Sequence, residues 1–313
     1  MKNTFKQPGL YLITGGYGFI GSHLADALLA RGHRVRILDD LSTGHVENVR
    51  GPHEFIRGDV GDATAVNQAM AGVNGCFHLA AVASVQRSNE DWAGTHRANQ
   101  TGSVLVFNAA RQTPPVPVVY ASSAAVFGDN PNVPLVEWEP IQPLTAYGAD
   151  KAGSELHGRV AARVHGVPNV GLRFFNVYGP RQDPSSPYSG VISIFVDRIL
   201  AGRPLTIFGD GEQTRDFVYV ADVVAHLLAA MERATEPHAR IFNVCTNQAT
   251  SINQLAHTLF ELAGRRVDVV HQPPRSGDIR TSVGNPQRAV RELGVSARVV
   301  FRDGLRLLLD SQL

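Results

Sequence analysis

A tyrosine and a lysine stand four residues apart, at Tyr147 and Lys151, and a strand-like run upstream ends in two hydroxyls, Ser122 and Ser123. Residues i and i+4 share a helix face, so the phenol and the ammonium can meet in one site. A phenol has an unperturbed pKa of about 10, and a nearby cation lowers that pKa by stabilising phenolate. This group of residues predicts a site that moves a proton on or off a substrate hydroxyl.

A glycine-rich turn lies near the N-terminus. It follows an apolar run, Leu10–Thr14, that is typical of a buried parallel strand, and it precedes a helical pattern over residues 22–31. We expect Gly15 to permit the tight turn, Gly18 to let the backbone approach a pyrophosphate, and Gly21 to let helix and strand pack closely. The pyrophosphate would lie at the helix N-terminus, where free N–H groups and the dipole favour anions.

A second apolar run ends at Asp39, about twenty residues after the glycines, where a carboxylate hydrogen-bonds the adenosine ribose in dinucleotide sites. A carboxylate there repels a 2′-phosphate, which favours NAD over NADP. The strand, the glycines, the helix and the acid together predict an NAD site.

The elements that must position these residues alternate along the first half of the chain. Such a βαβα order predicts an α/β fold, a Rossmann-type doubly wound parallel sheet with helices on both faces. We expect strands at 55–57, 75–79, 116–121 and 170–174, helices at 63–71, 93–112 and 147–166, and a loop at 128–144.

After Asn176 the alternation breaks, and three prolines with several serines indicate an irregular segment that lines the ligand cleft. Strands at 205–208 and 267–271 and helices within 192–201 and 251–313 predict a smaller C-terminal α/β lobe for the substrate. Returns to the sheet are expected at 217–219 and 241–244. The two lobes therefore interleave, with 1–175 and 216–245 binding NAD and 176–215 and 246–313 binding the substrate.

Composition excludes several classes of protein. A net charge of +1 over 313 residues provides no basic surface for nucleic acid, and no apolar stretch is long enough to span a membrane. Residues 1–9 lack the apolar core of a signal peptide. Cys76 and Cys245 form no metal-ligand pattern, and the histidines are scattered, so we expect buried thiols, a reducing cytoplasm and no metal site.

Taken in order, these motifs resemble the extended short-chain dehydrogenase/reductase family, in particular its NAD-dependent UDP-sugar 4-epimerases of the UDP-galactose and UDP-N-acetylglucosamine type. The resemblance covers nearly the whole chain. The motifs that carry it are GGYGFIG at 15–21, DDLSTG at 39–44, GD at 58–59, HLAA at 78–81, SSAAVFG at 122–128, YGADK at 147–151, RFFNVYGPRQD at 173–183, FGDGEQTRDF at 208–217 and RSGD at 275–278.

The resemblance implies a role for each matching residue. Tyr147 would be the general base for the sugar 4-OH, Ser123, preferred over Ser122, would hydrogen-bond the same oxygen, and Lys151 would bind the nicotinamide ribose and lower the tyrosine pKa. The residues implied to contact NAD are Gly15, Gly18, Phe19, Ile20, Gly21, Asp39, Asp59, Val60, Leu79, Ala80, Ala81, Asn99, Tyr147, Lys151 and Phe174. Those implied to contact the UDP-sugar are Ser123, Asn176, Phe208, Arg215, Arg275, Asp278 and Ser282.

The implied reaction is inversion at C4 through a 4-keto sugar that turns about its diphosphate tether. Two departures bear on the subtype. Dehydratases and decarboxylases of the superfamily place an acid just after the active-site hydroxyl, whereas Ala124 and Ala125 follow Ser123 here. A bulky tyrosine at the position of Ser282 excludes N-acetyl groups in the family, so serine favours UDP-N-acetylglucosamine and its galacto epimer.

Alternatives remain open from the sequence. UDP-glucose or UDP-glucuronate could be the substrate instead, a 4,6-dehydratase or decarboxylase is disfavoured by Ala124 and Ala125, and a non-catalytic NAD-binding protein would not need the serine, tyrosine and lysine. The resemblance also implies a homodimer that packs the 93–112 and 147–166 helices into a four-helix bundle.

Overall fold

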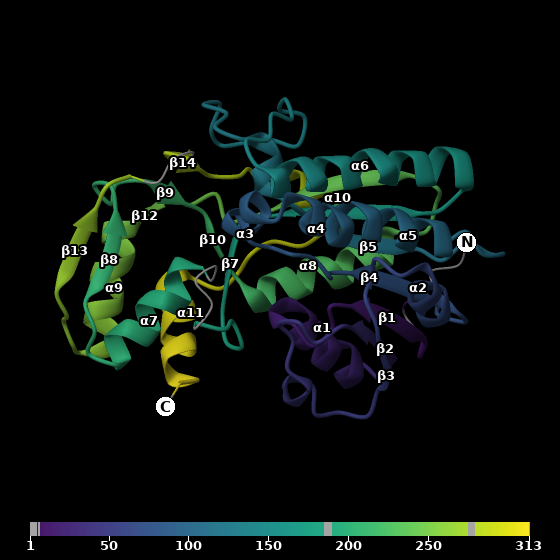
Figure 1. Ribbon diagram of the computed structural model, residues 1–313, viewed down its shortest axis with the longest axis horizontal. Helices are drawn as coiled ribbons and strands as arrows, with labels where there is room; N and C mark the ends of the chain where they lie inside the picture. The colour runs from purple at the N-terminus through teal and green to yellow at the C-terminus, as the bar shows by residue number, and fades with distance from the viewer. Residues whose placement is uncertain (1–4, 6, 185–189, 275–278, 313) are drawn as a thin grey trace.

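The computed structural model describes residues 5, 7–184, 190–274 and 279–312. Its centre is a sheet of seven parallel strands in the order β11-β6-β5-β4-β1-β2-β3 (Figure 1), which confirms the predicted Rossmann-type α/β fold. The strands are β1 (Leu10–Thr14), β2 (Arg34–Asp39), β3 (Glu54–Arg57), β4 (Gly75–His78), β5 (Val118–Ser123), β6 (Asn169–Phe174) and β11 (Ala239–Val244).

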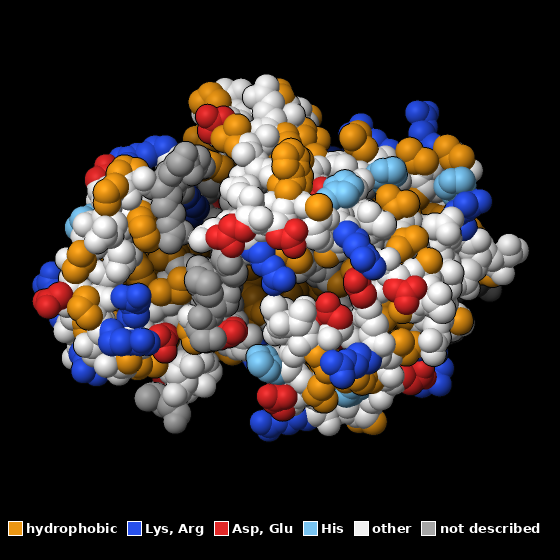
Figure 2. Space-filling model, in the orientation of Figure 1, with side chains coloured by type: hydrophobic (Ala, Val, Ile, Leu, Met, Phe, Trp, Pro, Cys, Tyr) orange, Lys and Arg blue, Asp and Glu red, His pale blue; other side chains and the backbone are white. Residues whose placement is uncertain are grey.

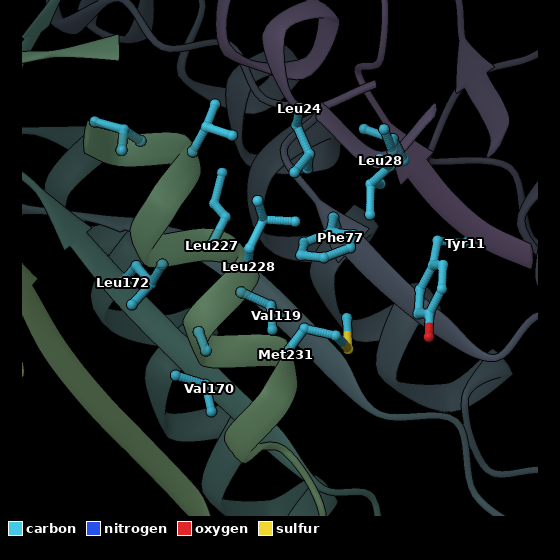
Figure 3. Close-up of a cluster of buried hydrophobic side chains, with 14 of the residues drawn as sticks. Tyr11, Leu24, Leu28, Phe77, Val119, Val170, Leu172, Leu227, Leu228 and Met231 are labelled. Atoms are coloured by element: carbon cyan, nitrogen blue, oxygen red, sulfur yellow. The ribbon is translucent and has the colours of Figure 1, made fainter. Parts of the chain in front are cut away.

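Helices cover both faces of this sheet, which is why its central strands are continuous apolar runs. Tyr11 and Ile13 point to the face covered by α1 (Phe19–Ala30) and α8 (Val220–Arg233), as Figure 3 shows for the packing around Leu227, Leu228 and Met231. Leu10 and Leu12 point to the opposite face, which is covered by α2 (Ala63–Met70), α5 (Gly102–Ala109) and α6 (Ala146–His165).

The helix predicted at 93–112 differs from the expectation in its interior. It begins as α4 (Trp92–His96), passes through a π-helical segment, Arg97–Thr101, and continues as α5. A short helix that the sequence did not predict, α3 (Val85–Glu90), precedes it. Single π turns widen a helix locally and often lie at functional sites. The π segment here carries Asn99, whose contacts are described below.

The helix that carries Tyr147 and Lys151 has a defined signal at each end. Thr145 caps its N-terminus by accepting a hydrogen bond from the Gly148 amide at 3.0 Å, and Gly166 ends it in the left-handed conformation with φ of 68°. Between these residues α6 spans 20 residues, so the predicted helix is confirmed to within one residue at each end.

A second lobe lies beside the carboxyl ends of the strands and contains its own apolar core (Figure 1). Its elements are α7 (Val191–Leu200), β8 (Leu205–Phe208), β9 (Thr214–Arg215), β12 (Thr250–Ser251), α9 (Ile252–Ala263), β13 (Val269–Gln272), β14 (Thr281–Ser282) and α11 (Phe301–Asp310). β8 pairs with β13, and β9 pairs with both β12 and β14. The pairing through β9 places Arg215 beside Ser282 as register partners.

The chain crosses between the lobes differently from the prediction at two places. Residues 217–219 do not return to the large sheet, because β10 (Phe217–Tyr219) pairs with β7 (Asn176–Tyr178) in a separate two-stranded sheet. The helix α10 (Gln287–Leu293) returns to the large sheet, where Ala289 and Leu293 enter its core. The expected loop at 128–144 contains one isolated bridge, between Leu135 and Gly284.

Candidate active site

The proton-transfer residues predicted from the sequence meet where β5 ends and α6 begins. Tyr147, in the first turn of α6, lies close enough to the Ser123 side chain for that hydroxyl to affect its pKa. Lys151 lies one turn further on, with its Nζ 5.7 Å from the centre of the tyrosine ring and donating to the Ala121 carbonyl at 2.9 Å. The structure thus brings Ser123, Tyr147 and Lys151 together.

The electrostatics of this group differ from the expectation in one respect. Burial raises the pKa of Tyr147, and the hydrogen bond from Ser123 opposes that rise, so Ser123 provides the lowering that the sequence attributed to Lys151. Burial also lowers the pKa of Lys151 to about 8, against which the Asp150 carboxylate acts. The pKa of Lys151 therefore lies close to neutral pH, and its side chain donates a hydrogen bond to the end of β5.

The two adjacent serines have separate partners. Ser122 is 1 % exposed and donates to the Glu155 carboxylate at 2.6 Å. Ser123 is partly exposed, and its Oγ accepts from the Ala125 amide at 3.1 Å while it faces Tyr147. Ser123 is thus the hydroxyl available to a ligand.

The contact between Ser123 and Tyr147 has a consequence for pH dependence. If Tyr147 is the base that the sequence predicts, it must be deprotonated to act, and activity should rise as pH passes upward through its pKa. Ser123→Ala removes the hydrogen bond that opposes burial, and we expect the lower-pH limb of the kcat profile to move to higher pH. Turnover of both proteins measured over a pH range that extends above 10 tests this, because burial raises the pKa of Tyr147 above its ordinary value. An unmoved limb would contradict the role of Ser123.

The glycine turn fits closely between β1 and β4. Gly15 has φ of +70°, and a Cβ on it would lie 2.8 Å from the backbone nitrogen of Ala80. A Cβ on Gly21 would overlap the carbonyl oxygen of Gly15. Leu79 and Ala80 each donate a backbone N–H to the Thr14 hydroxyl at 3.2 Å. Leu79 and Ala80 therefore lie against the glycine turn, as the predicted cofactor site requires.

A buried histidine, which the sequence analysis named only as part of the motif at 78–81, supports this turn. His78 accepts or donates at both ring nitrogens, 2.8 Å from the Thr14 hydroxyl and 3.1 Å from the Ser103 hydroxyl. Because burial lowers its pKa to about 3, His78 is neutral and carries one N–H. The Thr14 hydroxyl already accepts two amides, so its hydrogen points to Nδ1 of His78, and Nε2–H donates to Ser103.

The N-terminus of α1 can accept an anion. No acidic side chain occupies its first turn, which begins with Phe19 and Ile20, and the cap residue Gly18 provides no side-chain hydrogen bond. A Cβ on Gly18 would contact only the Gly15 carbonyl, at 3.3 Å, so its backbone is open to a ligand. Free N–H groups and the helix dipole there suit a pyrophosphate, and these residues fit the predicted NAD.

Further along the cofactor side, Asp39 lies at the end of β2, at the expected place. Its two oxygens accept the backbone N–H groups of Tyr17 at 3.0 Å and Leu41 at 2.9 Å, while burial raises its pKa. Asp59 is exposed and accepts the Gly61 amide at 2.7 Å. Its neighbour Val60 is buried.

Asn99 and Phe174 complete the predicted cofactor residues. The side-chain amide of Asn99 accepts from the Val82 N–H at 2.8 Å and donates to the Val82 carbonyl at 3.2 Å. Asn99 thus fixes the chain just beyond Ala81, next to residues that are predicted to contact NAD. Phe174 ends β6 and is 8 % exposed.

The predicted substrate residues lie in the second lobe and at its junction with the sheet. Arg215 Nη1 donates to the Thr214 carbonyl at 2.9 Å and the Ile279 carbonyl at 2.7 Å, beside Ser282. Asn176 is exposed at the start of β7, and Phe208 is partly buried at the end of β8. Arg275 and Asp278 lie outside the described residues.

A buried carboxylate that the sequence analysis missed organises this junction. Asp216 has no exposed surface and accepts from the Thr246 N–H and hydroxyl, from the Asn247 N–H at 2.9 Å and from the Gly284 N–H at 3.2 Å. Its position directly after Arg215 in the motif at 208–217 was the available signal. Asp216 links the strands that carry Arg215 and Ser282 to the end of β11.

The site lies at the carboxyl ends of the parallel strands, where the order reverses between β1 and β4, which is the usual ligand crevice of doubly wound folds. Figure 2 shows a hollow between the sheet side and the smaller lobe. These features define a Rossmann-fold enzyme that binds a dinucleotide. Among the described residues no cluster could hold a metal ion, and no described helix has the length and apolar character needed to cross a bilayer.

The chain belongs to the NAD dependent epimerase/dehydratase family, which matches residues 11–245. It is similar to a UDP-glucose 4-epimerase of Mycolicibacterium smegmatis, with 38% identity over 94% of this chain and 95% of that protein. NAD is accordingly its cofactor, and the chain is an enzyme of the isomerase class.

Two solved structures share the complete fold. The UDP-glucose 4-epimerase of Thermotoga maritima, with UDP-glucose, has a TM-score of 0.92 and 36% identity over 97% of this chain and 98% of that one. The UDP-N-acetylglucosamine 4-epimerase of Methanobrevibacter ruminantium, in complex with UDP-N-acetylmuramic acid, has a TM-score of 0.92 and 34% identity over 98% of both chains.

Proposed function

We propose that this enzyme is a UDP-sugar 4-epimerase that interconverts UDP-N-acetylglucosamine and UDP-N-acetylgalactosamine. The single observation that carries the chemistry is the placement of Ser123 beside Tyr147, where β5 ends and α6 begins, with Lys151 near the tyrosine ring. Similarity to UDP-sugar 4-epimerases of both kinds supports the reaction class. The choice of an N-acetylated sugar rests on Ser282.

In the proposed mechanism the chain moves a proton at one oxygen of the sugar. Tyr147 accepts the proton of the 4-OH, and Ser123 hydrogen-bonds the same oxygen, so the substrate oxygen is held between two hydroxyl groups. NAD, when bound, supplies a nicotinamide that accepts a hydride and returns it. After the 4-keto sugar has turned, Tyr147 returns its proton to the same C4 oxygen. Because the turned sugar would receive the hydride on the other face of C4, the net result is inversion at C4.

The cofactor and the diphosphate would each be fixed by groups already described. Gly15, Gly18 and Gly21 would receive the NAD pyrophosphate at α1, and Asp39 would meet the adenosine ribose. Arg215 would bind the substrate diphosphate, because charge-assisted contacts can fix that end and leave the sugar free to turn. Ala124 and Ala125, in the turn after Ser123, provide no acid for elimination, which favours epimerisation over dehydration.

The sugar preference is proposed from the surroundings of Ser282. Its side chain is small and 9 % exposed, and its strand β14 pairs with the strand of Arg215. Because Ser282 is this close to Arg215, which would bind the diphosphate, we expect it to form a wall of the pocket beside the sugar. With serine rather than a bulky side chain there, the wall leaves room for an N-acetyl group at C2.

Ser282→Tyr tests this proposal. We expect kcat/KM for UDP-N-acetylglucosamine to fall at least about tenfold, because a tyrosine ring would fill the space of the acetyl group, a loss of about 1.4 kcal/mol. The value for UDP-glucose should change less. Steady-state kinetics with both sugars measures the ratio, and equal losses on the two would count against Ser282 as the determinant.

The reaction itself is tested with the purified protein and UDP-N-acetylglucosamine. Anomeric proton signals followed by NMR should show the galacto epimer accumulating to equilibrium. No galacto product with or without added NAD would refute the proposed substrate. If product formed from UDP-glucose alone, the 4-epimerase assignment would stand, but the substrate would be the non-acetylated sugar.

We also propose a homodimer through α5 and α6. The exposed face of α6 carries apolar residues, Leu156 (56 % exposed), Val160 (47 %) and Val164 (69 %), where a charged surface would be usual. A shallow groove between α5 and α6 is lined by Val104, Phe107, Arg111 and His157, among others. Such a face suits packing against its own copy in a four-helix bundle.

We propose that the two interleaved lobes bind different ligands. Residues 1–175 and 216–245 would bind NAD, and 176–215 and 246–313 would bind the UDP-sugar, with α10 as an exception because it packs on the large sheet. A cytoplasmic location is proposed as well, since both cysteines, Cys76 and Cys245, are buried free thiols.

A further inference from the structure

The helix α6 presents three side chains at four-residue spacing to the last three residues of β5. Tyr147 lies beside Ser123, whose hydroxyl affects its pKa, and Lys151 donates to the Ala121 carbonyl at 2.9 Å. Glu155, one turn beyond Lys151, accepts from the Ser122 hydroxyl at 2.6 Å. The first two contacts belong to the proton-transfer group described above, whereas the third has no role in it.

The third contact belongs to a buried charge pair. Glu155 and Arg173 have side chains that are each 2 % exposed, and they form two parallel hydrogen bonds, of 2.8 Å from Nε and 2.7 Å from Nη2. Arg173 also donates to the Glu137 carbonyl at 3.0 Å, and its guanidinium lies 4.6 Å from the centre of the Phe127 ring. The guanidinium and the carboxylate are therefore well satisfied and fixed in orientation.

A pair of this kind adds little net stability, because the cost of removing both charges from water offsets their attraction. Its rigid geometry is the feature that needs an explanation. Arg173 is the register partner of Ser122 in the neighbouring strand β6. The pair thus connects the Ser122 position of β5 to both β6 and α6.

The end of β5 needs this connection because one of its edges is unpaired. The ladder between β4 and β5 ends at Tyr120, whereas the ladder between β5 and β6 continues to Ser123. Residues 121–123 are therefore held by β6 on one side, and the contacts from α6 supply the remaining restraint. The Ser123 hydroxyl at this end of the strand, which is paired on one edge only, must still face the Tyr147 phenol.

We propose that Glu155, oriented by Arg173, is a positioning residue for proton transfer, because through Ser122 it fixes the end of β5 so that Ser123 faces Tyr147. This proposal rests on the proposed function for its kinetic readout only. Releasing Ser122 leaves Ser123 free to move away from the phenol. Since that hydrogen bond opposes the effect of burial on Tyr147, its weakening raises the pKa of the tyrosine.

Ser122→Ala is the direct test, since it removes the contact with Glu155 and leaves the charge pair intact. We expect kcat to fall about 10- to 10²-fold, the scale of a small misplacement of reacting groups. The KM for the UDP-sugar and the amount of bound NAD should not change, and the lower-pH limb of the kcat profile should move upward. A change in KM alone would overturn the proposal.

A matched control removes a buried hydrogen bond between β6 and α6 further along the helix, together with one to the chain after it. Asn169 is fully buried, and its amide donates to the Gly158 carbonyl at 2.9 Å and the Val167 carbonyl at 3.0 Å. Asn169→Ala should lower stability but leave kcat and its pH profile unchanged. If it altered both as Ser122→Ala does, loss of stability would account for the effect and the proposal would fail.

The double variant Ser122→Ala/Ser123→Ala tests whether Ser122 acts through Ser123. Once Ser123 is absent, removing the Ser122 hydroxyl should lower kcat no further. A second, equal loss in the Ser123→Ala background would overturn the proposal.

The carboxylate itself is tested by two further variants. Glu155→Gln leaves a buried guanidinium without its counter-charge, so we expect lower stability together with lower kcat. Adding Arg173→Met removes that buried charge and should restore stability. The proposal predicts that kcat stays low in this double variant, and recovery of kcat along with stability would overturn it.

A spectroscopic titration keeps this inference separate from the proposed substrate. Tyrosinate absorbance measured against pH, with the Tyr147→Phe protein as the reference, isolates the titration of Tyr147. Ser122→Ala should shift that titration to higher pH whether or not any UDP-sugar is turned over. An unchanged titration would refute the positioning role even in an active epimerase.

Discussion

Tyr147→Phe is expected to lower kcat about 10²- to 10⁴-fold, the usual contribution of a positioned acid or base. The substitution removes the phenolic oxygen that would accept the sugar proton and leaves the ring in place. Because the glycine turn and Asp39 lie on other elements, NAD should remain bound. Turnover of the UDP-sugar by NMR and the NAD content of the purified protein measure the two effects.

The chain provides a matched control for this substitution. Tyr120 is 1 % exposed, and its hydroxyl has no hydrogen-bond partner among the described residues. Tyr120→Phe therefore removes a buried phenolic oxygen without removing a bond, and kcat should be unchanged. Substantial turnover by the Tyr147→Phe protein would show that another group acts as the base.

Gly21→Ala and Gly18→Ala should distinguish a glycine that the fold requires from one that only cofactor binding requires. A Cβ on Gly21 would overlap the Gly15 carbonyl oxygen, so we expect a loss of about 1–3 kcal/mol of stability, as in overpacked sites, together with loss of bound NAD. A Cβ on Gly18 would meet only that same oxygen, at 3.3 Å. Gly18→Ala should retain its stability to within about 1 kcal/mol.

Gly18→Ala should nevertheless bind NAD at least tenfold more weakly, or about 1.4 kcal/mol, because its methyl group would stand where the pyrophosphate approaches the backbone. Thermal unfolding with and without added NAD distinguishes the two variants. Equal loss of stability in both apo proteins would contradict the separate roles assigned to the two glycines.

The sheet could be predicted from the sequence because its determinants are local. Leu10–Thr14 is apolar throughout and followed by glycines, and the capping residues Thr145 and Gly166 mark the ends of α6. Residues 217–219 look like the other strands in composition, but their pairing with β7 is set by the second lobe. Strand identity follows from local pattern, whereas the choice of partner strand does not.

The site was predictable to the extent that its chemistry lies in short motifs. Ser123, Tyr147 and Lys151 follow from spacing, and the structure brings them together. The partners of Asp216 and the pairing of Glu155 with Arg173 could not be found in this way, because the bonded residues are 18 or more positions apart in sequence. Carboxylates that accept backbone amides or pair with a buried arginine resemble surface charges until the fold is known.

The junction at Asp216 has a consequence for how the protein can move. One carboxylate bonds the chain after β11 and the chain after β14, while Leu135, from the loop before α6, exchanges backbone hydrogen bonds of 2.8 Å with Val283 and Asn285. A hinge that opened the lobes widely would break all of these buried contacts at once. We therefore expect the crevice to keep nearly constant walls through a catalytic cycle, so that the sugar reorients inside a rigid chamber.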